Sequence, residues 1–242
     1  MLLYADLMIE EARSVSTEET DRNSSRQIQL VFGEIFRAHL AGEAVSPTQL
    51  AAVSGTSFEN IRLLLRGAQG DDLIDVEQRG RTRHIRPKPK LIELCEDRVL
   101  NLLNSVRAVP ISAKNAHELH YGFLALHAAD VRIEDFRLNH LLRSTHGRAF
   151  CCLLYRNFIY GKRDLSVNDI LDALPVSHET VRLMKKDLIE MDMASQYKRG
   201  RRTHLHPTQQ LVTEMDAYLA RILVYVDKNM GSLRAREMVT TV

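Results

Sequence analysis

Two short basic stretches contain the residues of this sequence best suited to binding phosphate groups. Residues 78–90 hold six arginines and lysines and residues 198–206 hold four, with no acidic residue in either stretch. Each stretch includes the triplet Arg-Gly-Arg, and its glycine lets a tight turn bring the guanidinium groups close to another molecule. The formal net charge of the chain is only +2, so the rest of the sequence is net acidic. This concentration of positive charge favours contact with nucleic acid.

The two basic stretches lie in longer segments that resemble each other. Residues 46–91 align without a gap with residues 166–211, which lie 120 positions later, and 12 of the 46 aligned positions are identical. Self-similarity of this kind indicates an internal duplication. Besides the basic triplets, the identical pairs include Ser57 and Ser177, Glu59 and Glu179, Arg62 and Arg182, Leu63 and Leu183, Asp72 and Asp192, and His84 and His204.

Each copy reads as two short helices followed by a two-stranded hairpin. In the second copy Ser166 and Ser177 are predicted N-caps, the first for residues 167–174 and the second for a helix that continues to about residue 191. The apolar residues on one face of this longer helix are Val181, Met184 and Leu188, matched in the first copy by Ile61, Leu64 and Ala68. We expect both helices to bury this face.

The turn that follows each longer helix requires a residue in the left-handed conformation. Asp72 and Asp192 stand at this position, and aspartate tolerates that conformation better than most residues other than glycine. The strands are predicted to follow at residues 73–77 and 84–86 in the first copy, and at 193–197 and 204–206 in the second. The basic triplets then occupy the tips of two hairpins.

The second copy resembles winged helix-turn-helix repressors of the MarR and GntR type. The resemblance rests on the run from Val176 to Ala194, on Lys198-Arg-Gly-Arg-Arg202 and on Pro207, and residues 56–87 of the first copy resemble the family less closely. It implies a mainly α-helical fold with small β-hairpin wings, in which two winged helix-turn-helix modules are joined by helices. Winged helices also serve as protein-binding modules.

The resemblance also implies which residues would contact DNA. The longer helix of each copy would enter a major groove, where residues near its N-terminus face base edges. The wings would hold phosphates or enter a minor groove. The candidate DNA-binding residues are Ser57, Asn60, Arg62, Arg66, Arg79, Arg81 and Arg83 in the first copy, and Ser177, His178, Thr180, Arg182, Lys185, Lys198, Arg199, Arg201 and Arg202 in the second.

Several of these candidates have a structural interpretation as well. Ser57 and Ser177 fit the role of helix caps, and Arg182 could form an ion pair with Glu179 on the same helix face. Glu59 and Glu179 stand where a helix dipole favours acidic residues, and they could also accept from cytosine.

The remaining sequence is predicted to be helical and to hold the two modules together. We expect an N-terminal helical segment over residues 1–24, a first module with a trailing helix over 25–108, a helical linker over 109–147, a second module with a trailing helix over 148–230, and a flexible tail over 231–242. Within the linker, residues 115–129 and 133–142 have helical patterns. The trailing helices, over 91–106 and 211–226, could mediate homodimerisation or pack on their own modules.

Other chemistry finds little support in the sequence. His117 and His120 have a spacing that suits metal binding, but no third ligand stands at a supporting spacing, so no metal or cofactor is expected. No motif of a phosphate-binding loop, serine hydrolase or zinc protease is present, which argues against an enzyme. No apolar run reaches the length of a membrane span. Three cysteines, two of them adjacent, indicate a reducing compartment and a cytoplasmic protein.

The expected function is that of a bacterial transcription regulator that binds specific double-stranded DNA sequences. Two alternatives remain open. A plasmid replication initiator also pairs two winged helices, and a scaffold subunit of a chromosome-organisation complex would use the same fold to contact protein. Arginine on both hairpin tips favours DNA over the scaffold.

Overall fold

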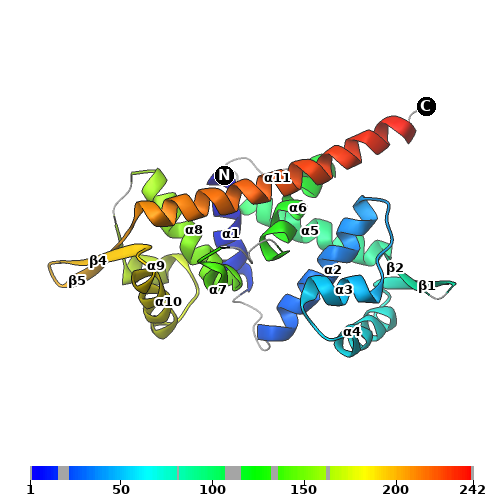
Figure 1. Cartoon of the computed structure of the whole chain (residues 1–242), viewed down its shortest axis with the longest axis horizontal. Coiled ribbons are helices and arrows are strands. Elements are labelled where there is room, and N and C mark those ends of the chain that lie inside the picture. The colour runs from blue at the N-terminus through cyan, green and yellow to red at the C-terminus, as the bar shows by residue number, and fades with distance from the viewer. Residues whose placement is uncertain are drawn as a thin grey trace. The chain divides into compact units, whose positions relative to one another are not determined.

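The computed structural model of the chain describes residues 2–15, 22–80, 82–106, 116–131, 136–161 and 164–240. This described part is mainly helical and contains two small antiparallel sheets (Figure 1). The helices are α1 (Leu2–Val15), α2 (Arg22–Leu40), α3 (Pro47–Ser54), α4 (Phe58–Gly70), α5 (Pro89–Val106), α6 (Ala116–Val131), α7 (Asn139–Leu142), α8 (Thr145–Ile159), α9 (Val167–Ala173), α10 (His178–Glu190) and α11 (Gln209–Thr240). The strands are β1 (Ile74–Arg79), β2 (Thr82–Pro87), β3 (Leu165–Ser166), β4 (Ala194–Arg199) and β5 (Arg202–Pro207).

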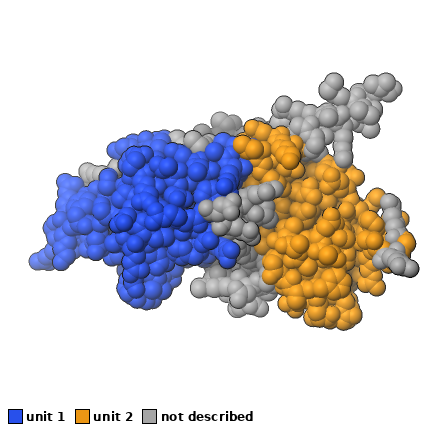
Figure 2. Space-filling view, viewed as in Figure 1, with its two compact units in different colours: residues 1–19, 105–108, 132–223 blue, residues 20–104, 109–131, 224–242 orange. Residues whose placement is uncertain are grey.

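The chain divides into two compact units, coloured separately in Figure 2. Unit 1 consists of residues 1–19, 105–108 and 132–223, and unit 2 of residues 20–104, 109–131 and 224–242. Each unit therefore combines segments that are far apart in the sequence.

Residues 46–87 of unit 2 and residues 166–207 of unit 1 have the same order of elements. We call them the first and second segments. Each has a short helix, a 13-residue helix and a β-hairpin of two 6-residue strands. The bounds of α4, β1 and β2 lie 120 positions before those of α10, β4 and β5. Within each unit the hairpin extends away from the helices that precede it (Figure 1).

The serines predicted to cap these helices do so. The Ser57 hydroxyl accepts a hydrogen bond from the Asn60 amide at 3.2 Å, and Ser177 accepts from the Thr180 amide at 3.1 Å. Ser166 also accepts from the Asp169 amide, while the Asp169 carboxylate accepts from the Ser166 amide at 2.7 Å. These bonds satisfy amides that have no partner within the helix, so each helix begins where its serine stands.

The turns after α4 and α10 also form as predicted. Asp72 has a φ of 60° and Asp192 a φ of 59°. This left-handed residue lets the next amide return to the helix: Leu73 donates to the Ala68 carbonyl, and Met193 donates to the Leu188 carbonyl. The chain then leaves each helix directly into a strand.

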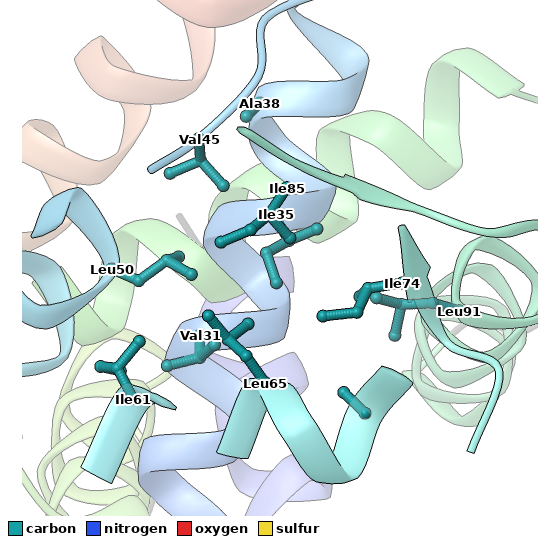
Figure 3. Packing of buried hydrophobic residues seen from close by; sticks show 11 residues of the cluster. Val31, Ile35, Ala38, Val45, Leu50, Ile61, Leu65, Ile74, Ile85 and Leu91 are labelled. Atoms are coloured by element: carbon teal, nitrogen blue, oxygen red, sulfur yellow. The ribbon is translucent and has the colours of Figure 1, made fainter. Parts of the chain in front are cut away.

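The core of the first segment joins its helices to its hairpin. Buried apolar side chains from α2, α3, α4, β1, β2 and α5 form one cluster, which includes Ile35, Ile61 and Ile85 (Figure 3). In α4 the fully buried residues are Ile61, Leu65 and Ala68, whereas Leu64 is only partly buried. The sequence analysis placed Leu64 on the buried face, but Leu65 is the buried residue, so this prediction was wrong by one position. Consecutive leucines at 63, 64 and 65 leave the apolar face ambiguous in the sequence.

The core of unit 1 is built on α8. Helix α1 packs against α8, and most of the α8 side chains are buried. The buried Arg148 guanidinium lies 3.5 Å from the Glu11 carboxylate, which links the two helices by an ion pair. The Tyr155 hydroxyl donates to Asp216 of α11 at 2.5 Å. The apolar side of α11, including Leu219, is buried as well.

Three features differ from the sequence-based expectations. In the predicted helix over 133–142, residues 136–138 form a bend and turn before α7, and residues 132–135 lie outside the described range. The strands are longer than expected because hairpin pairing continues to the residues flanking the tips, Arg79 with Thr82 and Arg199 with Arg202. Helix α11 continues to Thr240, into the segment assigned to a flexible tail.

Candidate nucleic-acid interface

The exposed face of α4 and the exposed face of α10 each carry an arginine paired with a glutamate. Nε and Nη2 of Arg182 donate to the two carboxylate oxygens of Glu179 at 2.7 and 2.6 Å. Arg62 donates to one oxygen of Glu59 at 3.2 and 2.6 Å. The hydrogen bond from Arg182 lowers the pKa of Glu179 below its usual range, so the pair is ionised at neutral pH. The ion pair considered for Arg182 is thus present.

The other helix candidates lie at or near the N-terminal ends of α4 and α10. Asn60 and His178 are exposed, and Thr180 is half-buried. The Asn60 side-chain amide donates to the Thr56 hydroxyl at 3.3 Å, and the hydroxyls of Thr180 and Ser177 lie 2.9 Å apart. Further along each helix, Arg66 is exposed and Lys185 is half-buried. The structure therefore keeps most of these polar groups within reach of solvent.

The first hairpin has a tight turn next to its basic residues. Gly80 has a φ of 61°, a conformation that favours glycine, and the Gln78 side chain donates to its carbonyl at 2.7 Å. Arg83 is exposed on β2. Arg79 belongs to β1, but its side chain is not described, and Arg81 lies outside the described residues.

Ion pairs at the base of the first hairpin neutralise part of the positive charge of the residues that follow β2. The Lys88 ammonium lies 2.6 Å from the Asp72 carboxylate and 3.4 Å from that of Asp75. Lys90 donates to the Asp71 carbonyl at 2.9 Å. These lysines therefore hold the hairpin base to the end of α4.

The second hairpin presents four exposed basic side chains. Gly200 has a φ of 64° and forms the tip between Arg199 and Arg201. Lys198, Arg199, Arg201 and Arg202 are all exposed. Their guanidinium and ammonium groups can donate to phosphate oxygens.

A small cavity in the first segment is lined by residues of α3, α4, β1 and β2. Its cavity volume is about 170 Å³. Three of the candidate residues, Arg62, Arg66 and Arg83, contribute to its lining. The remaining lining residues are Pro47, Phe58, Leu65, Gln69 and Val76. Arginines of the helix and the hairpin thus share the lining of this cavity with apolar side chains.

A polar network at the base of the second hairpin was missed by the sequence analysis. The Asp164 carboxylate accepts from the Tyr197 hydroxyl and lies 2.6 Å from Nδ1 of His206. Nδ1 of His204 lies 3.3 Å from the Asp164 carbonyl, and its ring stacks on Tyr197. Partial burial raises the pKa of Asp164, but the bonds from Tyr197 and His206 outweigh it and lower the pKa below its usual range.

The network gives His204 and His206 a structural role, since both rings lie against Asp164. Asp164 adjoins β3, and β3 pairs with β5 through Leu165 and Leu205. The signal in the sequence was the alternation of His204 and His206 on one side of a strand, but Asp164 lies 40 and 42 residues before them. In unit 2 the contact that corresponds to the pairing of β3 with β5 is a bridge between Val45 and Ile85.

Within the described ranges, histidine, cysteine and acidic side chains form no group of three or more that could hold a metal ion. His117 belongs to α6, but its side chain is not described. Among the helices that the structure describes, none is both long and apolar enough to cross a membrane.

No protein-family model matches the chain, and no curated protein sequence shows significant similarity to it.

Proposed function

We propose that the chain is a transcription regulator that binds specific DNA sequences through two winged helix-turn-helix modules, the first and second segments. The observation that carries the proposal is the repeated pairing of an exposed helix N-terminus with an arginine-bearing hairpin. An α-helix fits the major groove, and a basic hairpin beside it suits the flanking phosphates or minor groove. The helices α4 and α10 act as recognition helices and the hairpins as wings.

A chain with two such modules can bind two unequal half-sites. The residues at the start of the helices differ, with Phe58 and Asn60 on α4 and His178 and Thr180 on α10. A binding site for this chain therefore need not be a palindrome. A homodimer through helices outside the modules also belongs to the proposal.

We place this activity in the cytoplasm. The three cysteines, Cys95, Cys151 and Cys152, are free thiols, as expected in a reducing compartment.

The test is binding of the purified protein to random-sequence duplex DNA across a series of salt concentrations, followed by sequencing of the retained DNA. We expect affinity to fall steeply with salt and one motif to be enriched. Enrichment of directly repeated sites would favour the replication initiator instead. No binding at low salt would overturn the proposal and favour the protein scaffold.

The wing is tested with the double variant Arg199→Ala/Arg201→Ala. Loss of two phosphate contacts should flatten the slope of log affinity against log salt by about 2. The matched control is Arg143→Ala/Lys228→Ala, which removes the same charge from exposed positions outside both segments. An unchanged slope in the wing variant would contradict the role assigned to the second hairpin.

A further inference from the structure

The outward faces of α4 and α10 carry the same succession of residue types. A glutamate, an arginine, a leucine and a basic residue stand at positions i, i+3, i+4 and i+7, which share one face of a helix. They are Glu59, Arg62, Leu63 and Arg66 on α4 and Glu179, Arg182, Leu183 and Lys186 on α10, and all eight are exposed. The buried residues of each helix lie on a different face.

The stability of the helices gives little reason for this arrangement. The side chains of Glu179 and Arg182 are 61% and 59% exposed, and an ion pair so open to solvent contributes little to folding. Leu63 and Leu183 are 53% and 46% exposed, so each leaves about half of its surface outside the core. The same polar and apolar groups are thus presented outward twice, which suits contact with a partner.

We propose that both helices recognise the same short base sequence, an inference that rests on the DNA-binding function proposed above. In the second module the Arg182 guanidinium donates to N7 and O6 of a guanine, and Glu179 accepts from the amino group of a cytosine beside it. Leu183 contacts the methyl group of a neighbouring thymine. Glu59, Arg62 and Leu63 make the same contacts from the first module, so guanine, cytosine and thymine recur within about three base pairs in each half-site.

The charge of the pair favours base contact over phosphate contact. Because the glutamate neutralises the arginine, the two side chains together add no net attraction for the DNA backbone. A carboxylate close to DNA is repelled by the phosphates, and a hydrogen bond from a cytosine amino group offsets this repulsion. The bidentate bond from Arg182 to Glu179 also holds both side chains in place before DNA binds.

The neighbouring residues differ between the helices and make the half-sites unequal outside the shared element. Asn60 suits bidentate contact with an adenine, whereas Thr180 stands at the same position on α10. The first helical position also differs, with Phe58 on α4 and His178 on α10.

The first experiment replaces thymine by deoxyuridine, one position at a time, in the DNA motif selected by the wild-type protein. Loss of the contacted methyl group should weaken wild-type binding about fourfold at one position in each half-site. Leu183→Ala should abolish this difference in the half-site bound by the second module only, and Leu63→Ala in the other half-site. The leucine contact would be overturned by equal wild-type affinity for all thymine and uracil versions.

The second experiment compares Glu179→Gln with Glu190→Gln, a control on the same helix with the same change of charge, where Glu190 lies 3.5 Å from Lys186. Glu179→Gln should shift the selected base from cytosine toward adenine, since glutamine pairs with adenine. It should also steepen the salt slope by about 1, because the freed Arg182 can contact phosphate. Glu190→Gln should leave the selected bases unchanged.

The two proposals fail differently. If the wild-type protein selects a motif in which guanine, cytosine and thymine do not recur in both half-sites, this inference is overturned and the DNA-binding function stands. If the wild-type protein does not bind DNA at low salt, both are overturned. Thermal unfolding of each variant shows that a change in binding does not come from loss of the fold.

Discussion

The Asp164 carboxylate lies 2.6 Å from Nδ1 of His206 and joins the residue before β3 to the end of β5. Since the same carboxylate accepts from Tyr197 on β4, one aspartate holds both strands of the second hairpin. The proposed wing is therefore oriented by a residue outside the hairpin itself.

We predict that Asp164→Ala lowers the free energy of unfolding of unit 1 by about 1 kcal/mol, a value reduced because His206 is half exposed. The folded pKa of Asp164 is below its ordinary value of 3.8, so its stabilisation is present above pH 3.8 and is lost as the pH falls further. Denaturant unfolding of wild type and variant at several pH values checks this. A stability difference that stays constant below pH 3.8 would contradict the assigned cause.

The buried carboxylate of Glu34 gives a second pH-dependent prediction, in unit 2. Glu34 accepts from Arg37 at 2.8 Å and lies 3.1 Å from Nε2 of His127. Burial raises the pKa of Glu34, but the bonds from His127 and Arg37 outweigh it and lower the pKa to about 2. Its stabilisation is therefore complete above pH 4.5 and is lost as the pH falls toward 2.

Glu34→Gln should accordingly lower the free energy of unfolding of unit 2 by about 3 kcal/mol at neutral pH, because the partly buried Arg37 guanidinium loses the negative charge that it pairs with. Glu43→Gln is the matched control: its carboxylate lies 3.5 Å from Arg37 but is 55% exposed. We expect a change of less than about 1 kcal/mol for the control. Equal effects of the two changes in urea unfolding would show that burial does not govern this network.

Two glycine substitutions should act in opposite directions. Gly67→Ala should stabilise α4 by about 1 kcal/mol, since alanine has the higher helix propensity and nothing lies within 4 Å of the added methyl group. Gly33→Ala should destabilise α2, because the methyl group would lie 2.9 Å from Nδ1 of His127. Melting temperatures test both, and stabilisation by Gly33→Ala would rule out the close packing of α2 against His127.

The cysteines should be unreactive in the folded protein. Burial raises the pKa of Cys95 and of Cys152 to about 12, and it raises that of Cys151 as well. Since the thiolate is the reactive form, a disulfide reagent at pH 8 should modify the thiols slowly in the native state and rapidly in urea. Rapid modification of Cys151 or Cys152 in the native protein would indicate that α8 opens locally.

Much of the secondary structure could be predicted because its causes are local. A serine hydroxyl reaches an amide three residues ahead, so the starts of α4 and α10 were visible in Ser57 and Ser177. The left-handed turns at Asp72 and Asp192 likewise depend on neighbouring residues. Among the candidate site residues, the exposure of Arg62 and Arg182 followed from the helical spacing of the buried residues beside them.

The partners of several polar residues could not be predicted, since they lie far away in the sequence. Nothing near Glu34 marks His127, which lies 93 positions later, and nothing near His206 marks Asp164. The placement of Leu65 rather than Leu64 in the core depended on how α4 meets α3 and β1, because adjacent leucines have equal affinity for the interior.

The sequence by itself thus determined the helix starts, the turns, the hairpin tips and the concentration of positive charge on those tips, because each depends on residues within a few positions of one another. Tertiary structure alone decided which charges remain available. It tied Lys88 to Asp72 and His206 to Asp164, and left Arg199 and Arg201 exposed. Charge pairing across strands and segments depends on distances in space, and only folding brings those groups together.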